Sequence, residues 1–169
     1  MIKDTKNWTW VLERRCEDCS FDASTLTVDQ IGPQLVQACD ALAAAAGDRV
    51  RPSADVWSPL EYACHVRDIC RVFSARLSRI LTEDDPAFEN WDQDETAVAS
   101  RYGEQDPSVV ADDLRADARA LAVQFAAVTD WERTGLRSDG SRFTVRTLGQ
   151  YLVHDPVHHV WDVTPPGSH

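Results

Sequence analysis

The 169-residue sequence has no excess of basic side chains. It holds 17 Lys and Arg against 28 Asp and Glu, which gives a formal net charge of -11 at pH 7. Proteins that bind nucleic acids or anionic membranes usually meet the phosphate groups with clustered Lys and Arg. The composition therefore argues against both nucleic acid and membrane surfaces as partners.

Long apolar runs and targeting signals are also missing. The longest apolar stretches are short and rich in alanine, well below the roughly 20 residues that a membrane-spanning helix needs. The N-terminal segment MIKDTKNWTW has no basic region followed by an apolar one, unlike a secretory signal. Without such a signal we expect a cytoplasmic protein. With 43% apolar residues the chain can fill one core, so we expect a single domain.

The five cysteines are odd in number and irregularly spaced, so they do not predict the disulfide framework of a secreted protein. Cys16 and Cys19 have the C-x-x-C spacing of a zinc knuckle, but the pair supplies two of four ligands and no second C-x-x-C follows it. The pair could act in redox chemistry, consist of two ordinary thiols, or bind a second metal with further ligands. Candidates for those ligands are Cys39, Cys64, Cys70 and His159.

Each predicted helix begins with a capping residue that precedes apolar residues at helical spacing. The clearest signal is Ser58-Pro59-Leu60-Glu61, where the serine caps, the proline fits the first turn and the glutamate completes a capping box. Similar signals stand at Thr27, Asp106 and Thr144. The predicted helices span about 27–47, 58–81, 106–128 and 145–161.

The acidic segment from Glu83 to Asp106 predicts a long crossing connection with one short helix near 95–101. Four helices with one long crossover predict an all-α protein, a four-helix bundle. We expect residues 27–163 to form this bundle. Residues 1–26 would form an N-terminal arm that carries the C-x-x-C pair, and residues 164–169 would form a tail.

His154 and His158 lie four residues apart on the last predicted helix, so their imidazoles project from one face and can share a metal ion. His65 lies at the margin of the apolar stripe of the second helix. Three imidazoles from two facing helices predict a catalytic metal site with open positions for water or substrate. The alternative is ordinary surface or core histidines, but three of the five histidines fall within the short segment HDPVHH.

This segment also suggests the zinc-protease helix H-E-x-x-H. Two residues oppose that alternative, since Asp155 stands where Glu is required and Pro156 would disturb the helix.

Further polar and aromatic residues could support the predicted metal site. Three carboxylates at helical spacing from the histidines could orient the imidazoles, or lie on solvated helix faces. These are Asp68, Asp155 and Asp162. Three residues of the crossover could line the mouth of a substrate pocket, unless the tryptophan anchors the loop. These are Trp91, Gln93 and Asp94.

Two segments, WSPLEYACHVRD at 57–68 and HDPVHH at 154–159, resemble the DinB-like superfamily. The resemblance extends from Trp57 to Asp162 and includes the Asp-Gly turn with Phe143-Thr144-Val145. This superfamily includes YfiT-type metal hydrolases and the mycothiol-dependent maleylpyruvate isomerases. In particular, the chain resembles actinobacterial DinB family proteins that have an N-terminal C-x-x-C and a W-D-Q-D segment.

The resemblance implies a DinB-like bundle that binds zinc or nickel through His65, His154 and His158. Characterised members use the metal to activate a low-molecular-weight thiol, such as mycothiol, for transfer or isomerisation, because a cation stabilises the thiolate. A water ligand would instead give a hydrolase. We therefore expect an enzyme acting on a small molecule, with a non-catalytic metal- or ligand-binding protein as the alternative. Members often pair, so a homodimer is a further expectation.

Overall fold

The long helices begin at the capping residues that the sequence identifies. Ser58 Oγ accepts a hydrogen bond from the Glu61 amide while the Glu61 carboxylate accepts one from the Ser58 amide, and this capping box begins α2. Thr27, Asp106 and Thr144 cap the other three. The computed structural model describes residues 8–164, and its long helices are α1 (Val28–Ala45), α2 (Pro59–Thr82), α4 (Pro107–Ala126) and α5 (Val145–Val163).

Short helical elements occupy the arm and the crossover. The arm contains η1 (Trp8–Leu12) and η2 (Ala23–Thr25), and the crossover contains α3 (Gln93–Ala99) and η3 (Tyr102–Glu104). Helix α3 confirms the short helix expected in the crossover, although it begins two residues earlier because Asp92 caps it by accepting from the amides of Asp94 and Glu95.

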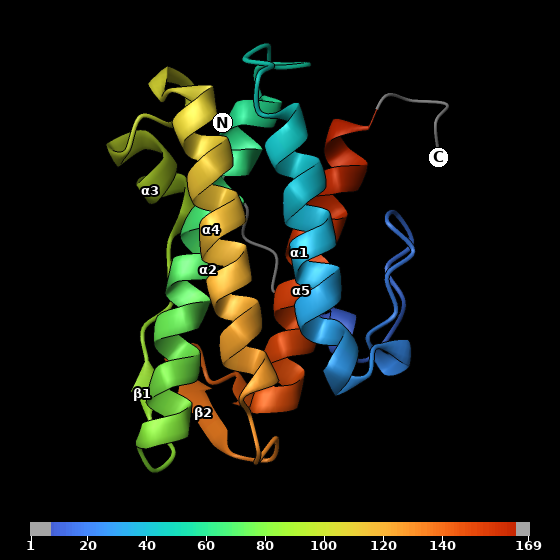
Figure 1. Ribbon diagram of the computed structural model, residues 1–169, viewed down its shortest axis with the longest axis vertical. Coiled ribbons are helices and arrows are strands. Elements are labelled where there is room, and N and C mark those ends of the chain that lie inside the picture. The colour runs from blue at the N-terminus through green and yellow to red at the C-terminus, as the bar shows by residue number, and fades with distance from the viewer. Residues whose placement is uncertain (1–7, 165–169) are drawn as a thin grey trace.

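The long helices lie side by side, with α1 and α2 each packed against α4 and α5 (Figure 1). Their apolar stripes meet in one core, where a leucine from each helix is fully buried; these are Leu35, Leu60, Leu114 and Leu148. The N-terminal arm packs on α5. There the Gln150 side chain donates to the carbonyl oxygens of Ala23 and Leu26, at 2.9 and 3.1 Å.

Three short strands in the described chain correct the all-α prediction. Strand β1 (Ala87–Phe88) pairs in parallel with β2 (Thr134–Arg137), which pairs antiparallel with β3 (Arg142–Thr144). The turn between β2 and β3 contains Gly140 at φ 92°, at the predicted Asp-Gly turn. Strands of two to four residues are too short to show the alternation of apolar and polar residues by which a sequence predicts a sheet.

Helix α5 continues through Pro156 and α1 through Pro33, so neither proline ends its helix. Within residues 8–164, no helix is both long enough and apolar enough to cross a membrane. The predicted division into arm, bundle and tail stays a prediction, because residues 1–7 of the arm and 165–169 of the tail lie outside the described residues.

Gly135 in β2 packs against the core with no room for a side chain. A Cβ there would lie 2.8 Å from both Ile80 Cγ1 and Phe88 Cε1. We predict that Gly135→Ala lowers the free energy of unfolding by about 1–3 kcal/mol, the usual effect of overpacking a core. In the control, Gly47→Ala, no atom of the described chain lies within 4 Å of the added Cβ. Denaturant titration compares the two variants, and equal stability would contradict the packing.

Candidate metal centres

Helix α5 carries two pairs of metal-binding side chains on different faces. His154 and His158 lie four residues apart, and so do Asp155 and His159. Consecutive helical residues point about 100° apart, so the two pairs, offset by one residue, meet different neighbours. In the part of the chain that the structure describes, two groups have ligand atoms within 4.8 Å of one another. The α2–α5 centre is His65, Asp155 and His159, and the arm centre is Cys16, Cys19, His154 and His158.

Asp155 lies between the two imidazoles of the α2–α5 centre. Its Oδ1 is 3.5 Å from His65 Nε2 and 3.6 Å from His159 Nε2. His65 is 0% exposed, and among residues 8–164 neither of its ring nitrogens nor Asp155 Oδ1 has a hydrogen-bond partner. An unsatisfied buried polar atom costs about 1–3 kcal/mol, and such atoms are rare. A divalent cation among these atoms would satisfy them, so the residues fit a metal ion.

Neighbouring side chains fix the orientation of both imidazoles in the α2–α5 centre. The Trp91 ring stacks on His65 at a centroid distance of 5.6 Å, and Trp57 packs on it at 5.2 Å. Asp162 Oδ2 lies 2.7 Å from His159 Nδ1. When Nδ1 donates to this carboxylate, Nε2 keeps its lone pair for a metal ion, which is the usual arrangement of a metal-binding histidine.

The charge states of the ligands suit a cation. Burial disfavours an ionised Asp155, but His65 and His159 outweigh it and lower the pKa of Asp155 to about 2. Burial, followed by the charge of His158, lowers the pKa of His154 to about 4. Burial also lowers the pKa of His158. At neutral pH these groups are therefore a carboxylate and neutral imidazoles, the forms that bind metals.

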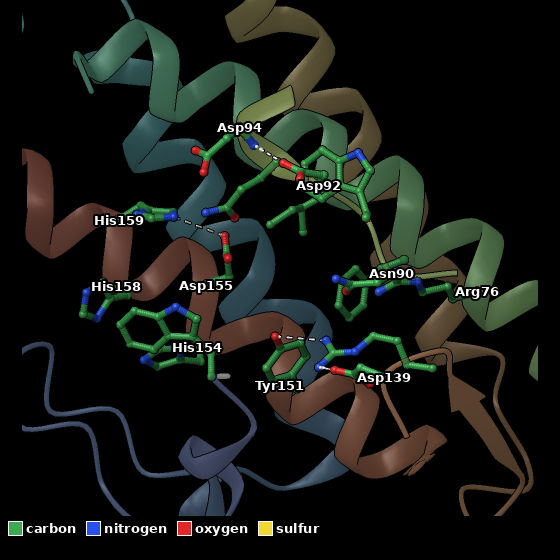
Figure 2. A pocket seen from close by; sticks show the side chains of 16 residues that line it. Arg76, Asn90, Asp92, Asp94, Asp139, Tyr151, His154, Asp155, His158 and His159 are labelled. Atoms are coloured by element: carbon green, nitrogen blue, oxygen red, sulfur yellow. Dashed lines mark hydrogen bonds and ion pairs between the residues drawn. The ribbon is translucent and has the colours of Figure 1, made fainter. Parts of the chain in front are cut away.

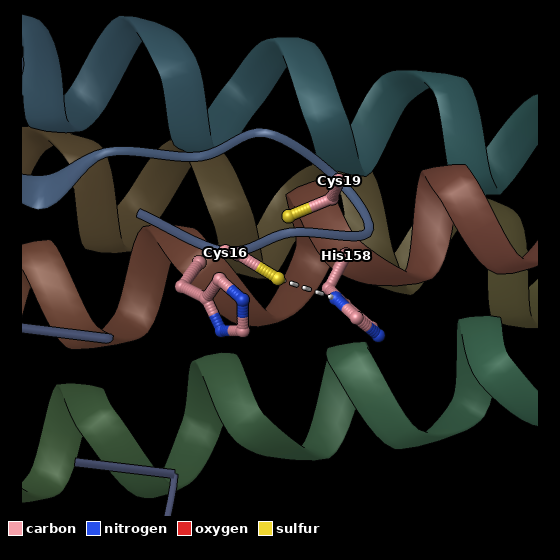
Figure 3. A group of neighbouring side chains, drawn as sticks. Cys16, Cys19 and His158 are labelled. Carbon is pink, nitrogen blue, oxygen red and sulfur yellow. Dashed lines mark hydrogen bonds between the residues drawn. The ribbon is translucent and has the colours of Figure 1, made fainter. Parts of the chain in front are cut away.

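The arm centre joins the C-x-x-C pair to α5. Cys16 Sγ lies 3.6 Å from His158 Nδ1 (Figure 3). Cys16 and His154 are buried, Cys19 is half-buried, and both cysteines are free thiols. Because the arm and α5 are far apart in sequence, this group exists only in the folded chain.

A cavity of about 410 Å³ adjoins both centres. Figure 2 shows Asp155 and His159 at one end of it and Arg76 and Asn90 at the other. The cavity is lined by side chains of the arm, of α2, of the crossover, of the β2–β3 hairpin and of α5. They are Trp8, Ile69, Phe73, Arg76, Asn90, Trp91, Asp92, Gln93, Asp94, Arg137, Asp139, Tyr151, His154, Asp155, His158 and His159. A small molecule that enters it would contact the α2–α5 centre.

The predicted three-histidine set is divided between the two centres. His154 and His158 do lie together, but they meet Cys16 and Cys19, whereas His65 meets Asp155 and His159. From the sequence we expected Asp155 to orient an imidazole, and His159 was a candidate ligand for a metal bound by the cysteine pair. The signal that could have identified them is their own spacing of four residues, which equals that of His154 and His158.

The other predicted site residues fall into three places. Asp162 lies against His159, Trp91, Gln93 and Asp94 line the cavity, and Asp68 lies apart from both centres. Asp68 accepts hydrogen bonds from Tyr102 Oη at 2.7 Å and Arg67 Nε at 2.9 Å. None of the remaining described cysteines belongs to either centre; these are Cys39, Cys64 and Cys70.

The fold and these groups define a helical bundle with candidate metal centres on its last helix. Residues 28–163 match the DinB superfamily, so the chain belongs to that superfamily. The structure is similar to that of YfiT from Bacillus subtilis, described as a probable metal-dependent hydrolase with an unusual four-helix bundle topology. The TM-score is 0.62 at 16% sequence identity, over 96% of this chain and 90% of that chain. No curated protein sequence matches the chain.

The position of Asp68 predicts a structural role. We predict that Asp68→Ala lowers the free energy of unfolding by about 2–4 kcal/mol, because buried Arg67 loses its carboxylate partner. The metal content of the folded variant should equal that of the unsubstituted protein. Elemental analysis measures the metal content and denaturant titration measures the stability. Loss of metal from the folded variant would indicate that Asp68 supports metal binding after all.

Proposed function

We propose that this protein is a metal-dependent enzyme whose divalent ion is held by His65, Asp155 and His159 at the wall of the cavity. The observation that carries the proposal is the fully buried His65 ring, which lacks a hydrogen-bond partner within the described chain at either nitrogen. Three protein ligands leave positions open for water or substrate, as catalytic sites do. YfiT, which has a similar fold, is described as a probable metal-dependent hydrolase.

The ligand set suits zinc or nickel, both of which bind imidazole and carboxylate groups. Such an ion lowers the pKa of a water or thiol bound to it and so supplies a nucleophile near neutral pH. The protein would hold the His159 ring through Asp162 and shield His65 from solvent with Trp91 and Trp57. With water as the nucleophile the enzyme is a hydrolase, and with a low-molecular-weight thiol such as mycothiol it is a transferase or isomerase.

The far end of the cavity favours a substrate with an anionic group. Arg76 is 7% exposed, lies over the rings of Phe73 and Phe88, and donates to the Glu89 carbonyl oxygen at 2.9 Å. Burial, followed by the charge of Arg137, lowers the pKa of Arg76 to about 10, so it stays charged at neutral pH.

Arg137 already pairs with Asp139 at 2.6 Å, whereas no carboxylate of residues 8–164 forms an ion pair with Arg76. A buried cation without a counter-ion is unfavourable. We propose that a carboxylate or phosphate of the substrate supplies that charge.

The metal ligands can be tested without knowing the substrate. We predict that Asp155→Ala and His159→Ala each lose the ion of the α2–α5 centre, because each removes one of three ligands. Elemental analysis measures the loss, and Asp68→Ala is the control, because it removes a carboxylate that belongs to neither centre. Ester, amide and thiol–electrophile substrates then separate hydrolase from transferase. Unchanged metal content in folded variants would overturn the proposal, and bound metal without turnover would indicate a binding protein.

The anionic subsite gives a separate prediction. Arg76→Met keeps the apolar contacts with Phe73 and Phe88 but removes the charge, so KM for anionic substrates should rise about tenfold or more, the effect of losing a charged hydrogen bond. KM for neutral analogues should stay the same. The matched control is Arg79→Met on the same helix, where the half-buried arginine pairs with Glu83 and lies outside the cavity. Equal effects on anionic and neutral substrates would contradict the subsite.

A further inference from the structure

The cysteine pair of the arm is not used by the proposed enzyme site, yet it lies against two histidines of α5. Figure 3 shows Cys16 and Cys19 on the loop of the arm and His158 on the facing helix. Cys16 and Cys19 precede residues 28–163, the part that matches the DinB superfamily. The group therefore includes residues that the family match does not cover.

The donor distances suit a tetrahedral zinc ion. Zinc binds thiolate sulfur at about 2.3 Å and imidazole nitrogen at about 2.0–2.1 Å, so sulfur and nitrogen ligands of one ion lie about 3.6 Å apart. Cys16 Sγ and His158 Nδ1 are 3.6 Å apart, and all four donor atoms lie within 4.8 Å of one another. Two cysteines and two histidines form one of the common closed ligand sets of structural zinc sites.

One buried nitrogen atom of this group lacks a hydrogen-bond partner in the described part of the chain, which favours a bound ligand. His154 is 3% exposed, and its Nε2 has no hydrogen-bond partner in the described part of the chain. A disulfide between Cys16 and Cys19 would leave that nitrogen unsatisfied, because disulfide sulfur has no proton to donate to it. A metal ion would satisfy the nitrogen and both thiols at once, which favours metal binding over a redox pair.

The loop between the cysteines is folded so that both thiols face α5. The Cys16 amide donates to the Phe21 carbonyl oxygen at 2.8 Å, and Arg15 Nε donates to the Ser20 carbonyl oxygen at 3.0 Å. Ser20 has φ 64°, in the left-handed region, which reverses the chain directly after Cys19. The turn thus holds both cysteines close to His154 and His158.

We propose that Cys16, Cys19, His154 and His158 form a structural zinc site that fastens the N-terminal arm to α5. The zinc would also hold the cavity wall, because Trp8 of the arm lines the cavity and its ring packs on His154 and His158 at 5.7 and 5.2 Å. His154 and His158 directly precede Asp155 and His159. The site would therefore hold the arm against the part of α5 that also carries the second pair.

Cobalt substitution of the full-length protein tests this site directly. Thiolate ligands give Co²⁺ a sulfur-to-metal charge-transfer absorption, and the α2–α5 centre has no sulfur, so this band reports the arm centre alone. We expect the band in the unsubstituted protein and in His159→Ala, and its loss in the double variant Cys16→Ser, Cys19→Ser. Cys64→Ala is the control, since Cys64 is a buried thiol outside the group.

The zinc content should follow the same pattern. The double variant should lose one zinc ion and melt at a lower temperature, while the ion at His65 stays bound. Absence of the charge-transfer band from the cobalt-loaded unsubstituted protein would overturn the proposal, even if the double variant does not fold. A Cys16–Cys19 disulfide in protein purified without oxidant would overturn it as well, as would equal zinc content in the folded double variant.

Discussion

The period of α5 is the constraint on which the site depends. An α-helix advances about 100° per residue, so two pairs of ligands that are offset by one residue cannot serve the same centre. His154 and His158 face the arm, while Asp155 and His159 face α2. The stretch 154–159 of the helix thereby contributes to two groups of different chemistry, a sulfur-containing set of four and an open set of three.

The burial of these ligands explains why the site and the fold depend on each other. Helices α2 and α5 bring His65 into the core, where its ring nitrogens have no hydrogen-bond partner within residues 8–164. Such a ring destabilises the bundle unless a ligand satisfies it. Bound metal would therefore stabilise the folded chain as well as supply chemistry. The arm adds to the cavity wall through Trp8, whose ring packs on His154 and His158.

The capping residues predicted where the helices of the bundle begin, because a helix cap depends on residues within one turn of the helix. The box of Ser58 and Glu61 and the cap at Thr144 each depend on residues at most three positions apart. The strands were not predicted, because β1 has only two residues and pairs with β2, which begins 47 positions after the start of β1. Pro156 was expected to disturb α5, yet helix packing on both sides maintains it.

The sequence by itself determined which residue types could bind a metal, their spacing of four along one helix, and the helices that carry them. It could not choose between His154 with His158 and Asp155 with His159 as partners of His65, because both pairs have the same spacing. That choice depends on how α5 is rotated about its axis against α2, which packing across the whole bundle decides. The meeting of Cys16 with His158, 142 positions apart, likewise follows from the tertiary fold alone.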